Sequence, residues 1–535
     1  MMKDGTVKKE FLLHDSQRQE SLERARHCAS LTKPWILPPD GWSEDQKLPS
    51  TFSSLAARGI TNLEGRLLLA LFPPGMPFFR FRPSSRFRFD PGVDPQQLSE
   101  FSDLLHLQEM VVMAHLDSMD RAGHGNARRA GFRSRMRTAI SQLLVTGDVL
   151  VHMTDDVNLR VFRRDNYVTK RNSSGDIQCH ITLEKIDPAT LNSKQLDAID
   201  MDAKSVLAKP AYERMEDMYT RVMWHPVTKR WVIEQEINGK TILESEESVT
   251  PYFSVPFELP PAANYGRGLI EQNLGDVRSM NELTERLLDF AALSSKLLFA
   301  VDYSSQVRPE DLARSTGEVI QARVQSGQVT DVGMLKVDKL QDFNIVGTTR
   351  ESIRKDLAVT MLMEGETTPR GERVTAFQVQ RVAMELEGAL GGVYAPIADA
   401  MQIPLIERVM EVLRRKKIMP SLPDETVEVE AVTGIQALTN ESDNGKLMQL
   451  MQVIAQLGPE TMGRVDKGIL MDLLVRQSGI YEPGLIKSDE QVQQEEAEAQ
   501  KAAMKQQVQA QAIQSGGNIM EQRAAQQPTE EPLNV

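Results

Sequence analysis

The sequence of 535 residues is poor in several features that usually reveal a function. Only two cysteines occur, Cys28 and Cys179, and they lie far apart without metal-ligand spacing, which excludes a disulfide scaffold and a zinc module. No apolar run approaches the roughly 18 residues that a membrane span needs, and the N-terminus lacks the apolar stretch of a signal peptide. We therefore expect a protein made in the cytosol, without a membrane partner.

Basic residues are also fewer than acidic residues. Lys and Arg total 62 against 75 Asp and Glu, so the formal net charge is −13. A protein that wraps DNA tightly needs many Lys and Arg contacts to phosphate, so any contact with nucleic acid should be loose or local. Aromatic residues are sparse at 5%, but 41% hydrophobic and 26% charged residues are ordinary for a globular chain. Its length indicates several structural regions.

Catalytic motifs are missing as well. The sequence contains no HExxH, no GxSxG and no paired cysteines. Residues 238–241 (Asn-Gly-Lys-Thr) include the Gly-Lys-Thr of a phosphate loop, but the glycine required five positions before Gly239 is Glu234, and the flanks resemble a hairpin. Three aspartates could bind a hard cation, although a solvated acidic turn is the simpler interpretation: Asp197, Asp200 and Asp202. We expect no catalytic residue, no metal and no cofactor.

Apolar residues at spacings of three and four predict that helices make up much of the chain. Expected helices span Lys9 to Lys33, Ser53 to Phe72, Gln97 to Met119, Leu269 to Leu298, Thr348 to Met363 and Ser442 to Gly479. A longer helical stripe is expected from Val379 to Met401, continuing past a kink at Pro404 to Lys417.

Strand signals dominate between Leu143 and Leu243. Asn238-Gly239 suits a type I′ turn, because both central residues of that turn need positive φ, and this predicts an antiparallel meander. A polar helical insertion is expected within it, from Pro188 to Lys209. Four prolines between Pro251 and Gly266 predict an extended connector after the meander.

Two basic tracts leave alternatives open. FFRFRPSSRFRFD, residues 78–90, alternates aromatic and arginine residues, which favours a half-buried strand over a nucleic-acid or partner surface. The second tract is either a solvated helix face or a phosphate-contacting patch. Its members are Arg128, Arg129, Arg133, Arg135 and Arg137. Its phosphate-contacting interpretation supports an alternative function, a nucleic-acid-binding enzyme or regulator.

Three long stretches resemble a known family in residue and spacing. They are SLAARGITNLEGRLLLALFP (54–73), YGRGLIEQNLGDVRSMNELTERLLDFAALSSK (265–296) and RGERVTAFQVQRVAMELEGALGGVYAPI (370–397). With them, the chain resembles the portal, or head-to-tail connector, proteins of short-tailed, podovirus-type double-stranded DNA bacteriophages.

The resemblance implies an α+β, mainly helical fold with wing, stem, clip and crown regions, in which long helices line a ring channel and the wing holds a β-meander. The implied regions are 1–264 (wing), 265–296 (first stem helix), 297–343 (clip), 344–363 (second stem helix), 364–374 (channel loop), 375–419 (long wing and crown helix), 420–486 (crown) and 487–535 (Gln-rich, partly disordered tail).

The resemblance also implies a function without an active site. Portal proteins form a ring of about twelve subunits at one capsid vertex, through which DNA is packaged and later ejected. The implied partners are copies of the chain itself, double-stranded DNA, the terminase large subunit, the tail adaptor, and the scaffolding and major capsid proteins. The ring belongs to the virion and is assembled in the host cytoplasm, and the nucleotide-driven motor is a separate protein.

Two sets of site residues follow from the resemblance. Arg370 and Arg373, with Pro369 and Gly371 flanking Arg370, would form a DNA-facing collar in the channel loop. In the alternative interpretation, Arg370 pairs with a nearby carboxylate and only shapes the turn; the candidates are Glu364, Glu366 and Glu372. The clip residues expected to contact terminase or the adaptor are Arg308, Glu310, Asp311, Arg314 and Arg323.

Overall fold

The computed structural model describes most residues up to 432. Described are residues 5–74, 77–84, 95–125, 131–156, 158–201, 210, 213–294, 299–301, 303, 323–326, 328–330, 332–334, 340–363, 376–390, 392–420 and 426–432. The chain divides into two compact units, Met1–Leu438 and Thr439–Val535. The second unit lies outside the described residues, and with it the helix expected from Ser442 to Gly479 and the Gln-rich tail.

Three helices, α3 (Leu55–Leu71), α6 (Phe132–Thr146) and α14 (Tyr394–Arg415), contribute much of the main hydrophobic core. On α3, Ile60, Leu63 and Leu67 are completely buried, as their helical spacing predicts. Burying each such side chain contributes about 1.5–3 kcal/mol before entropy is counted. The helix ends just before Pro73-Pro74, because the residue preceding a proline disfavours helical backbone.

The other helices follow the expected periodicity, with some additional breaks. They are α1 (Thr6–Gln17), α2 (Gln19–Ser30), α5 (Pro95–Gly125), α7 (Ser193–Ala198), α9 (Leu269–Gln272), α10 (Leu274–Ser294), α12 (Leu340–Thr360), α13 (Ala376–Leu390) and the short 3-10 turns η1 (Arg164–Asn166) and η2 (Pro188–Thr190). The helix expected from Lys9 to Lys33 is divided at Arg18, and the one expected from Leu269 is divided at Asn273.

The predicted meander is confirmed. Five strands pair in sequence order: β4 (Tyr167–Arg171), β5 (Ile177–Ile186), β6 (Glu216–His225), β7 (Arg230–Ile237) and β8 (Lys240–Glu247). At the tight turn between β7 and β8, Asn238 has φ 51° and Gly239 has φ 78°, the two positive values that a type I′ turn requires. A second sheet has the order β3-β2-β9, with β2 (Asp148–Met153) between β3 (Leu159–Phe162) and β9 (Tyr252–Pro256).

One local expectation in this region is wrong and a second is incomplete. Residues 143–146 belong to helix α6, so the strand signal begins only at Asp148. The connector after the meander is extended, but residues 252–256 form strand β9 and pair with β2. A proline at the end of β9 is compatible with pairing, because β9 is an edge strand and needs only one row of hydrogen bonds.

The long C-terminal helix breaks at a different place from the one expected. Helices α13 and α14 meet at a bend of 118° between Leu390 and Tyr394, whereas α14 continues through Pro404. Gly392 has φ 86°, the left-handed conformation in which glycine ends helices. Within the described ranges no single helix is long and apolar enough to cross a membrane, and only this bent pair passes that test by length and composition.

Three two-stranded sheets complete the described structure. β1 (Phe79–Pro83) pairs with β14 (Val427–Ala431), β10 (Phe299–Val301) with β13 (Val332–Met334), and β11 (Val324–Gln325) with β12 (Gln328–Val329). In β1 the rings of Phe79 and Phe81 are buried, which confirms the strand interpretation of the basic aromatic tract over residues 79–83. β14 comes from the range assigned to the crown, although its partner belongs to the range assigned to the wing.

Candidate functional site

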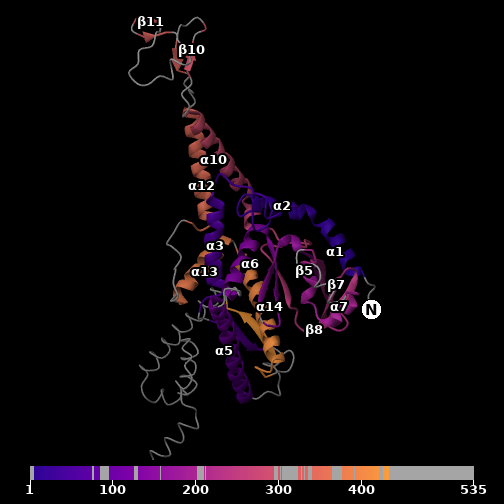
Figure 1. Ribbon diagram of the computed structural model, residues 1–535. Coiled ribbons are helices and arrows are strands. Elements are labelled where there is room, and N and C mark those ends of the chain that lie inside the picture. The colour runs from indigo at the N-terminus through magenta and orange to yellow at the C-terminus, as the bar shows by residue number, and fades with distance from the viewer. Residues whose placement is uncertain are drawn as a thin grey trace, which may run out of the picture. The chain divides into compact units, whose positions relative to one another are not determined.

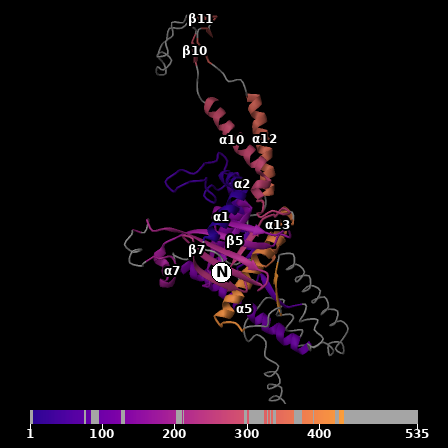
Figure 2. The ribbon, with the colours of Figure 1, turned by 90° about the vertical axis from the view of Figure 1, so that its right-hand side faces the viewer.

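Helices α10 and α12 run side by side (Figure 1; Figure 2). Near the base of the pair, Val277 and Met280 of α10 and Leu357 of α12 are buried. Towards the other end the apolar residues become exposed, with Leu288 at 54% and Ile345 at 65%. α12 begins at Leu340, within the range assigned to the clip.

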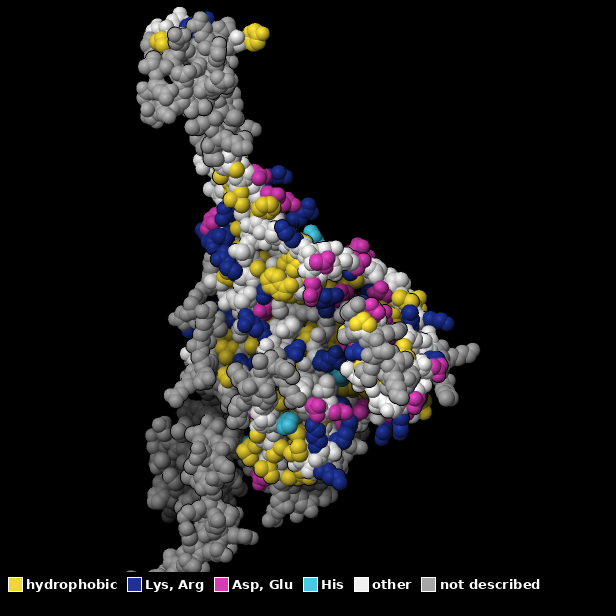
Figure 3. All heavy atoms as spheres, in the orientation of Figure 1, with side chains coloured by type: hydrophobic (Ala, Val, Ile, Leu, Met, Phe, Trp, Pro, Cys, Tyr) yellow, Lys and Arg dark blue, Asp and Glu magenta, His cyan; other side chains and the backbone are white. Residues whose placement is uncertain are grey.

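Acidic and basic side chains are mixed on the visible face of this helix pair (Figure 3). Arg278 bonds Glu282 at 2.7 Å on α10, and Arg354 bonds Glu351 at 2.8 Å on α12. Such exposed pairs support each helix locally and contribute little to stability, so they do not explain what the apolar residues of the pair contact.

The base of the helix pair depends on three closely packed glycines. A Cβ atom on Gly147, which has φ 80°, would lie 2.5 Å from the nitrogen of Gly268 and 2.6 Å from the carbonyl oxygen of Gly266. A Cβ atom on Gly268 would lie 2.9 Å from the nitrogen of Gly147. Only glycine fits at these positions, which explains the Gly-Arg-Gly of the sequence YGRGL.

A buried carboxylate lies beside these glycines. Asp148 Oδ1 accepts hydrogen bonds from the Tyr167 hydroxyl at 2.9 Å and the Ser254 hydroxyl at 3.2 Å, and the Gly266 amide approaches Oδ2 at 3.5 Å. Complete burial raises the pKa of Asp148, against the opposing effect of the nearby arginines. The network therefore joins β2, β4 and β9 to the chain that enters α9 and α10.

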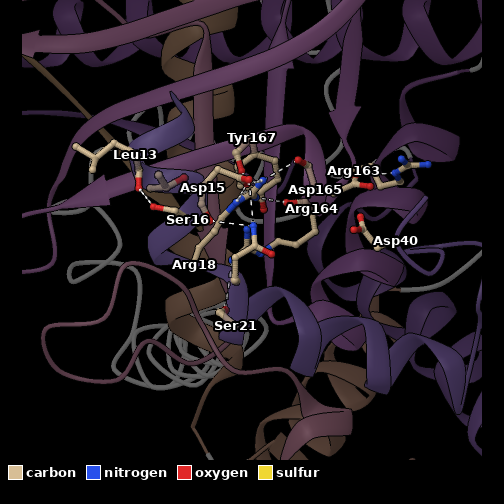
Figure 4. A network of polar contacts seen from close by, with 12 residues as sticks. Leu13, Asp15, Ser16, Arg18, Ser21, Asp40, Arg163, Arg164, Asp165 and Tyr167 are labelled. Carbon is tan, nitrogen blue, oxygen red and sulfur yellow. Dashed lines mark hydrogen bonds and ion pairs between the residues drawn. The ribbon is translucent and has the colours of Figure 1, made fainter. Parts of the chain in front are cut away.

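Two buried arginines extend this junction to the N-terminal helices (Figure 4). Arg18 lies between α1 and α2 and donates to the carbonyl oxygens of Arg164 at 2.6 Å, Asp165 at 2.7 Å and Tyr167. The Arg164 guanidinium stacks 3.7 Å from the ring centroid of Tyr265, the first residue of the YGRGL sequence. The glycine contacts, the Asp148 network and these two arginines therefore fix the start of the helix pair on the body.

The second helix returns to the same base, where α3 holds the C-terminus of α12. Asn62 donates hydrogen bonds to the carbonyl oxygens of Met361 at 3.1 Å and Leu362 at 2.7 Å. Met361 is completely buried, and a Cβ atom on Gly59 would lie 2.9 Å from the Met361 Cβ. The asparagine thus satisfies carbonyl groups that a helix end leaves without partners.

Helix α13, which follows residues 364–375, also contacts α3. Arg66 of α3 bonds Glu385 of α13 at 2.5 Å, and Arg381 bonds the same carboxylate at 3.2 Å. The chain therefore leaves α3 at Met363 and returns to it at α13. Pro369, Arg370, Gly371 and Arg373 lie between these anchors, outside the described residues.

Of the expected clip residues, the structure describes Arg323, whose carbonyl oxygen accepts the Thr330 amide at 3.0 Å across the β11–β12 hairpin. Arg323 is exposed. The other four, Arg308, Glu310, Asp311 and Arg314, lie outside the described residues.

The expected basic block is divided by the fold. Arg128 and Arg129 lie outside the described residues, while Arg133, Arg135 and Arg137 are on α6. Arg133 donates to the carbonyl oxygen of Phe72, and burial lowers its pKa. Arg137 bonds Glu64 of α3 at 3.4 Å. Two of the described arginines thus have partners within the chain.

The remaining sequence candidates are the Gly-Lys-Thr stretch and the three aspartates. The Gly-Lys-Thr stretch forms the β7–β8 turn, and Lys240 pairs with Asp200. Asp202 lies outside the described residues. In the described part of the chain, no three His, Cys, Asp or Glu side chains come together as a metal site would require.

A charged cluster attaches α14 to the two sheets. Arg408, almost fully buried, bonds Asp155 at 2.8 Å and Glu247 at 3.0 Å, and Arg415 also bonds Glu247. Burial by itself would raise the pKa of Glu247, but the hydrogen bonds from the two arginines outweigh it and lower the pKa. No sequence motif marked this cluster, because Asp155, Glu247 and the two arginines of α14 lie far from one another along the chain.

Comparison with known proteins identifies the family. The family described as "Bacteriophage head to tail connecting protein" matches residues 5–485. The chain belongs to this family. Its α+β, mainly helical character with antiparallel sheets also agrees with the fold class expected from the sequence.

Relatives of this connector are named portal proteins. That of Escherichia phage T7 is 27% identical over 489 residues, covering 89% of this chain and 87% of the relative. Those of Enterobacteria phages T3 and SP6 are each 26% identical, covering 90% and 91% of this chain and 88% and 92% of the relatives. The expected similarity to podovirus portal proteins is confirmed.

A solved structure titled "Neck of empty GTA particle computed with C6 symmetry" aligns with a TM-score of 0.35 and 10% identity, over 79% of this chain and 90% of that one. At this TM-score the alignment adds nothing to the description of the connector's fold.

The sequence analysis missed the residues that hold the site in place. Asn62 and Arg66 lie within the quoted stretch 54–73, but their partners on α12 and α13 are about three hundred residues away. The unusual YGRGL sequence was the one available signal, since two glycines so close together indicate a tight backbone approach.

Proposed function

We propose that this connector forms a closed ring of about twelve copies at one capsid vertex and is the conduit through which the genome is packaged and ejected. The observation that supports the proposal most directly is the attachment of α12 and α13 to the same helix, α3. It places both ends of residues 364–375 on one rigid element. In a ring, α3 would hold one copy of that segment per subunit at a fixed position.

The proposed channel function depends on Arg370 and Arg373. Repeated around a ring, two arginines per subunit form a collar of positive charge, and weak contacts that act together exert a substantial force on DNA phosphates. Each subunit otherwise carries a net charge of −13, so most of the wall would repel a polyanion and offer few places to stick. The collar would then grip the DNA weakly and oppose backward slippage.

The proposed regions indicate where each partner would bind. We assign 1–264 to the wing, 265–296 and 344–363 to the stem, 297–343 to the clip and 420–486 to the crown. The clip, with Arg308, Glu310, Asp311, Arg314 and Arg323, would bind the terminase large subunit and afterwards the tail adaptor, whereas the scaffolding and major capsid proteins surround the ring in the virion. The connector itself needs no catalytic activity, because the motor is a separate protein.

Imaging tests the ring directly. Purified full-length protein viewed by negative-stain electron microscopy should show rings with a central hole. A strictly monomeric species at high protein concentration and low salt would overturn the proposal.

The collar has a separate test. A variant carrying Arg370→Glu and Arg373→Glu should assemble rings normally but package or retain less DNA, because a ring of negative charge repels the phosphates. The matched control carries Lys at both positions and preserves the charge. If the Glu variant packages as much DNA as the control, the collar assignment is wrong, although the ring proposal stands.

A further inference from the structure

Two neighbouring cavities on the body share Val161 and Arg163 in their linings, and we call the two together the β3 trench. Their volumes are about 440 and 370 Å³. The trench lies between strand β3, helix α6, strand β5 and the segment that follows α2. The residues that matter to its chemistry are Lys33, Trp35, Arg137, Arg160, Arg163 and Lys185.

Strand β3 is an edge of its sheet. It pairs with β2 alone, so backbone groups along its other edge have no strand partner in the described structure. The carbonyl oxygen of Phe162 also accepts a hydrogen bond from Gln142 at 2.7 Å, which fixes the end of β3 on helix α6. An edge strand that lines a cavity is the site to which an extended peptide adds as another strand.

The charges of the trench are arranged in two levels. Glu64 and Glu184 have side chains only 3% and 10% exposed, whereas their partners Arg137 and Arg160 are each 53% exposed. The third pair is similar: the Arg163 side chain is 44% exposed and bonds, at 2.7 Å, the Asp165 side chain, which is 18% exposed. Because a guanidinium has five N–H groups and the buried carboxylates use few of them, the arginines present donors outward. A partner that approaches the trench therefore contacts the exposed arginines first, while the carboxylates lie buried below them.

An aromatic side chain stands at the mouth of the trench. Trp35 is 63% exposed, although large aromatic side chains are usually well buried, and Ile36 beside it is partly buried. An exposed indole next to exposed arginines is the combination that dominates binding energy in protein interfaces. The trench thus offers an apolar contact together with carboxylate-binding groups.

We propose that the β3 trench binds an extended acidic segment of a partner protein, which adds a strand to β3, places carboxylates on Arg137, Arg160 and Arg163, and packs an apolar side chain against Trp35. This inference goes beyond the ring and conduit and does not depend on them. A nucleic acid fits less well, because adding a strand to the edge of β3 requires backbone N–H and C=O groups, which a peptide has and a nucleic acid lacks.

Peptide binding to the full-length protein tests the proposal. The probe is a fluorescein-labelled peptide of alternating Glu and Val ending in Leu, and the comparison peptides replace every Glu with Gln or one central Val with Pro. We expect the acidic peptide to bind at least about tenfold more tightly than either, because the Gln peptide lacks charge and proline cannot pair as a strand. Equal binding of all three peptides would overturn the proposal.

Variants locate the binding site. Arg163→Glu combined with Arg137→Glu should weaken binding of the acidic peptide at least about tenfold, and Trp35→Ala should weaken it several-fold. The matched control is Arg230→Glu, an exposed arginine at the start of β7, which should bind like the unaltered protein. A circular dichroism spectrum confirms that each variant is folded. Full affinity in the folded double Glu variant would contradict the assignment.

Two further measurements separate the possible occupants. A labelled ten-nucleotide single strand should bind the unaltered protein and the double Glu variant alike; tighter binding that the variant loses would replace the peptide with nucleic acid as the occupant. Assembled rings and dissociated subunits should bind the acidic peptide equally. If only dissociated subunits bind it, a second copy covers the trench and the proposed partner is wrong.

Discussion

The packed body and the α10–α12 pair are built on different principles. In the body, α3, α6 and α14 bury apolar side chains on nearly every turn, and charged residues such as Lys33 and Glu64 are buried together as an ion pair. In the helix pair, burial ends a few turns from the base, and Leu288 and Ile345 remain exposed. The body thus has an extensive buried core within the single chain, whereas the outer part of the pair leaves apolar side chains exposed.

The difference follows from geometry. Two helices side by side can bury only the faces that touch, while helices packed on sheets bury most of their apolar stripe. In the proposed ring, neighbouring copies would cover the faces that remain. The following predictions test this contrast, from the largest expected effect to the smallest.

Gly147→Ala should be the most damaging change. It places a Cβ atom 2.5 Å from backbone at a residue with φ 80°, so we expect the free energy of unfolding to fall by more than about 4 kcal/mol. Gly275→Ala on α10, where the added Cβ meets nothing within 4 Å, should instead raise it by about 0.5–1 kcal/mol through helix propensity. Denaturant unfolding compares the two, and equal losses would mean that the helix pair is packed like the body.

Leu67→Ala should lower the free energy of unfolding by about 2–5 kcal/mol, because this α3 side chain is completely buried. Leu288→Ala removes a side chain that is 54% exposed and should cost less than about 0.5 kcal/mol in the dissociated subunit. If the ring proposal holds, Leu288→Ala should nevertheless reduce the fraction of rings in sedimentation experiments. A large loss of subunit stability in Leu288→Ala would contradict the proposed difference in packing between the body and the α10–α12 pair.

Asn62→Ala should weaken the attachment of the α10–α12 pair to the body. It removes the donors to the carbonyl oxygens of Met361 and Leu362 and should cost about 1–3 kcal/mol. Limited proteolysis should then cut faster between Met363 and Ala376, since the C-terminus of α12 is no longer held on α3. The neighbouring change Thr61→Ala removes only an exposed bond within α3 and should leave the cleavage rate unchanged.

The smallest effect concerns pH and the cluster on α14. The pKa of Glu247 in the folded protein lies below its ordinary value of 4.5. The stabilisation by its arginine partners is therefore fully present above about pH 4.5 and is lost as the pH falls through the lower folded pKa. Glu247→Gln should flatten the decline in stability over this interval, measured by thermal unfolding. Glu244→Gln, an exposed change on the same strand, should leave the decline as it is.

Much of the local structure follows from the sequence. The helix from Leu55 to Leu71 was predicted closely because its apolar spacing and the two prolines after it leave little freedom. The β7–β8 turn was predicted because Asn-Gly favours the two positive φ values found there. The break between α13 and α14 was misplaced, since a proline kink and a glycine helix end compete and local rules do not decide between them.

The sequence by itself determined the family, the periodic elements and the need for glycine in YGRGL, because these depend on neighbours a few residues apart. Only the tertiary structure showed that Asn62 and Arg66 hold the helices on either side of residues 364–375, that β1 pairs with β14, and that a trench of exposed arginines borders an edge strand. Such contacts join residues tens to hundreds of positions apart. Their partners are chosen by packing the whole core, which no short stretch of sequence encodes.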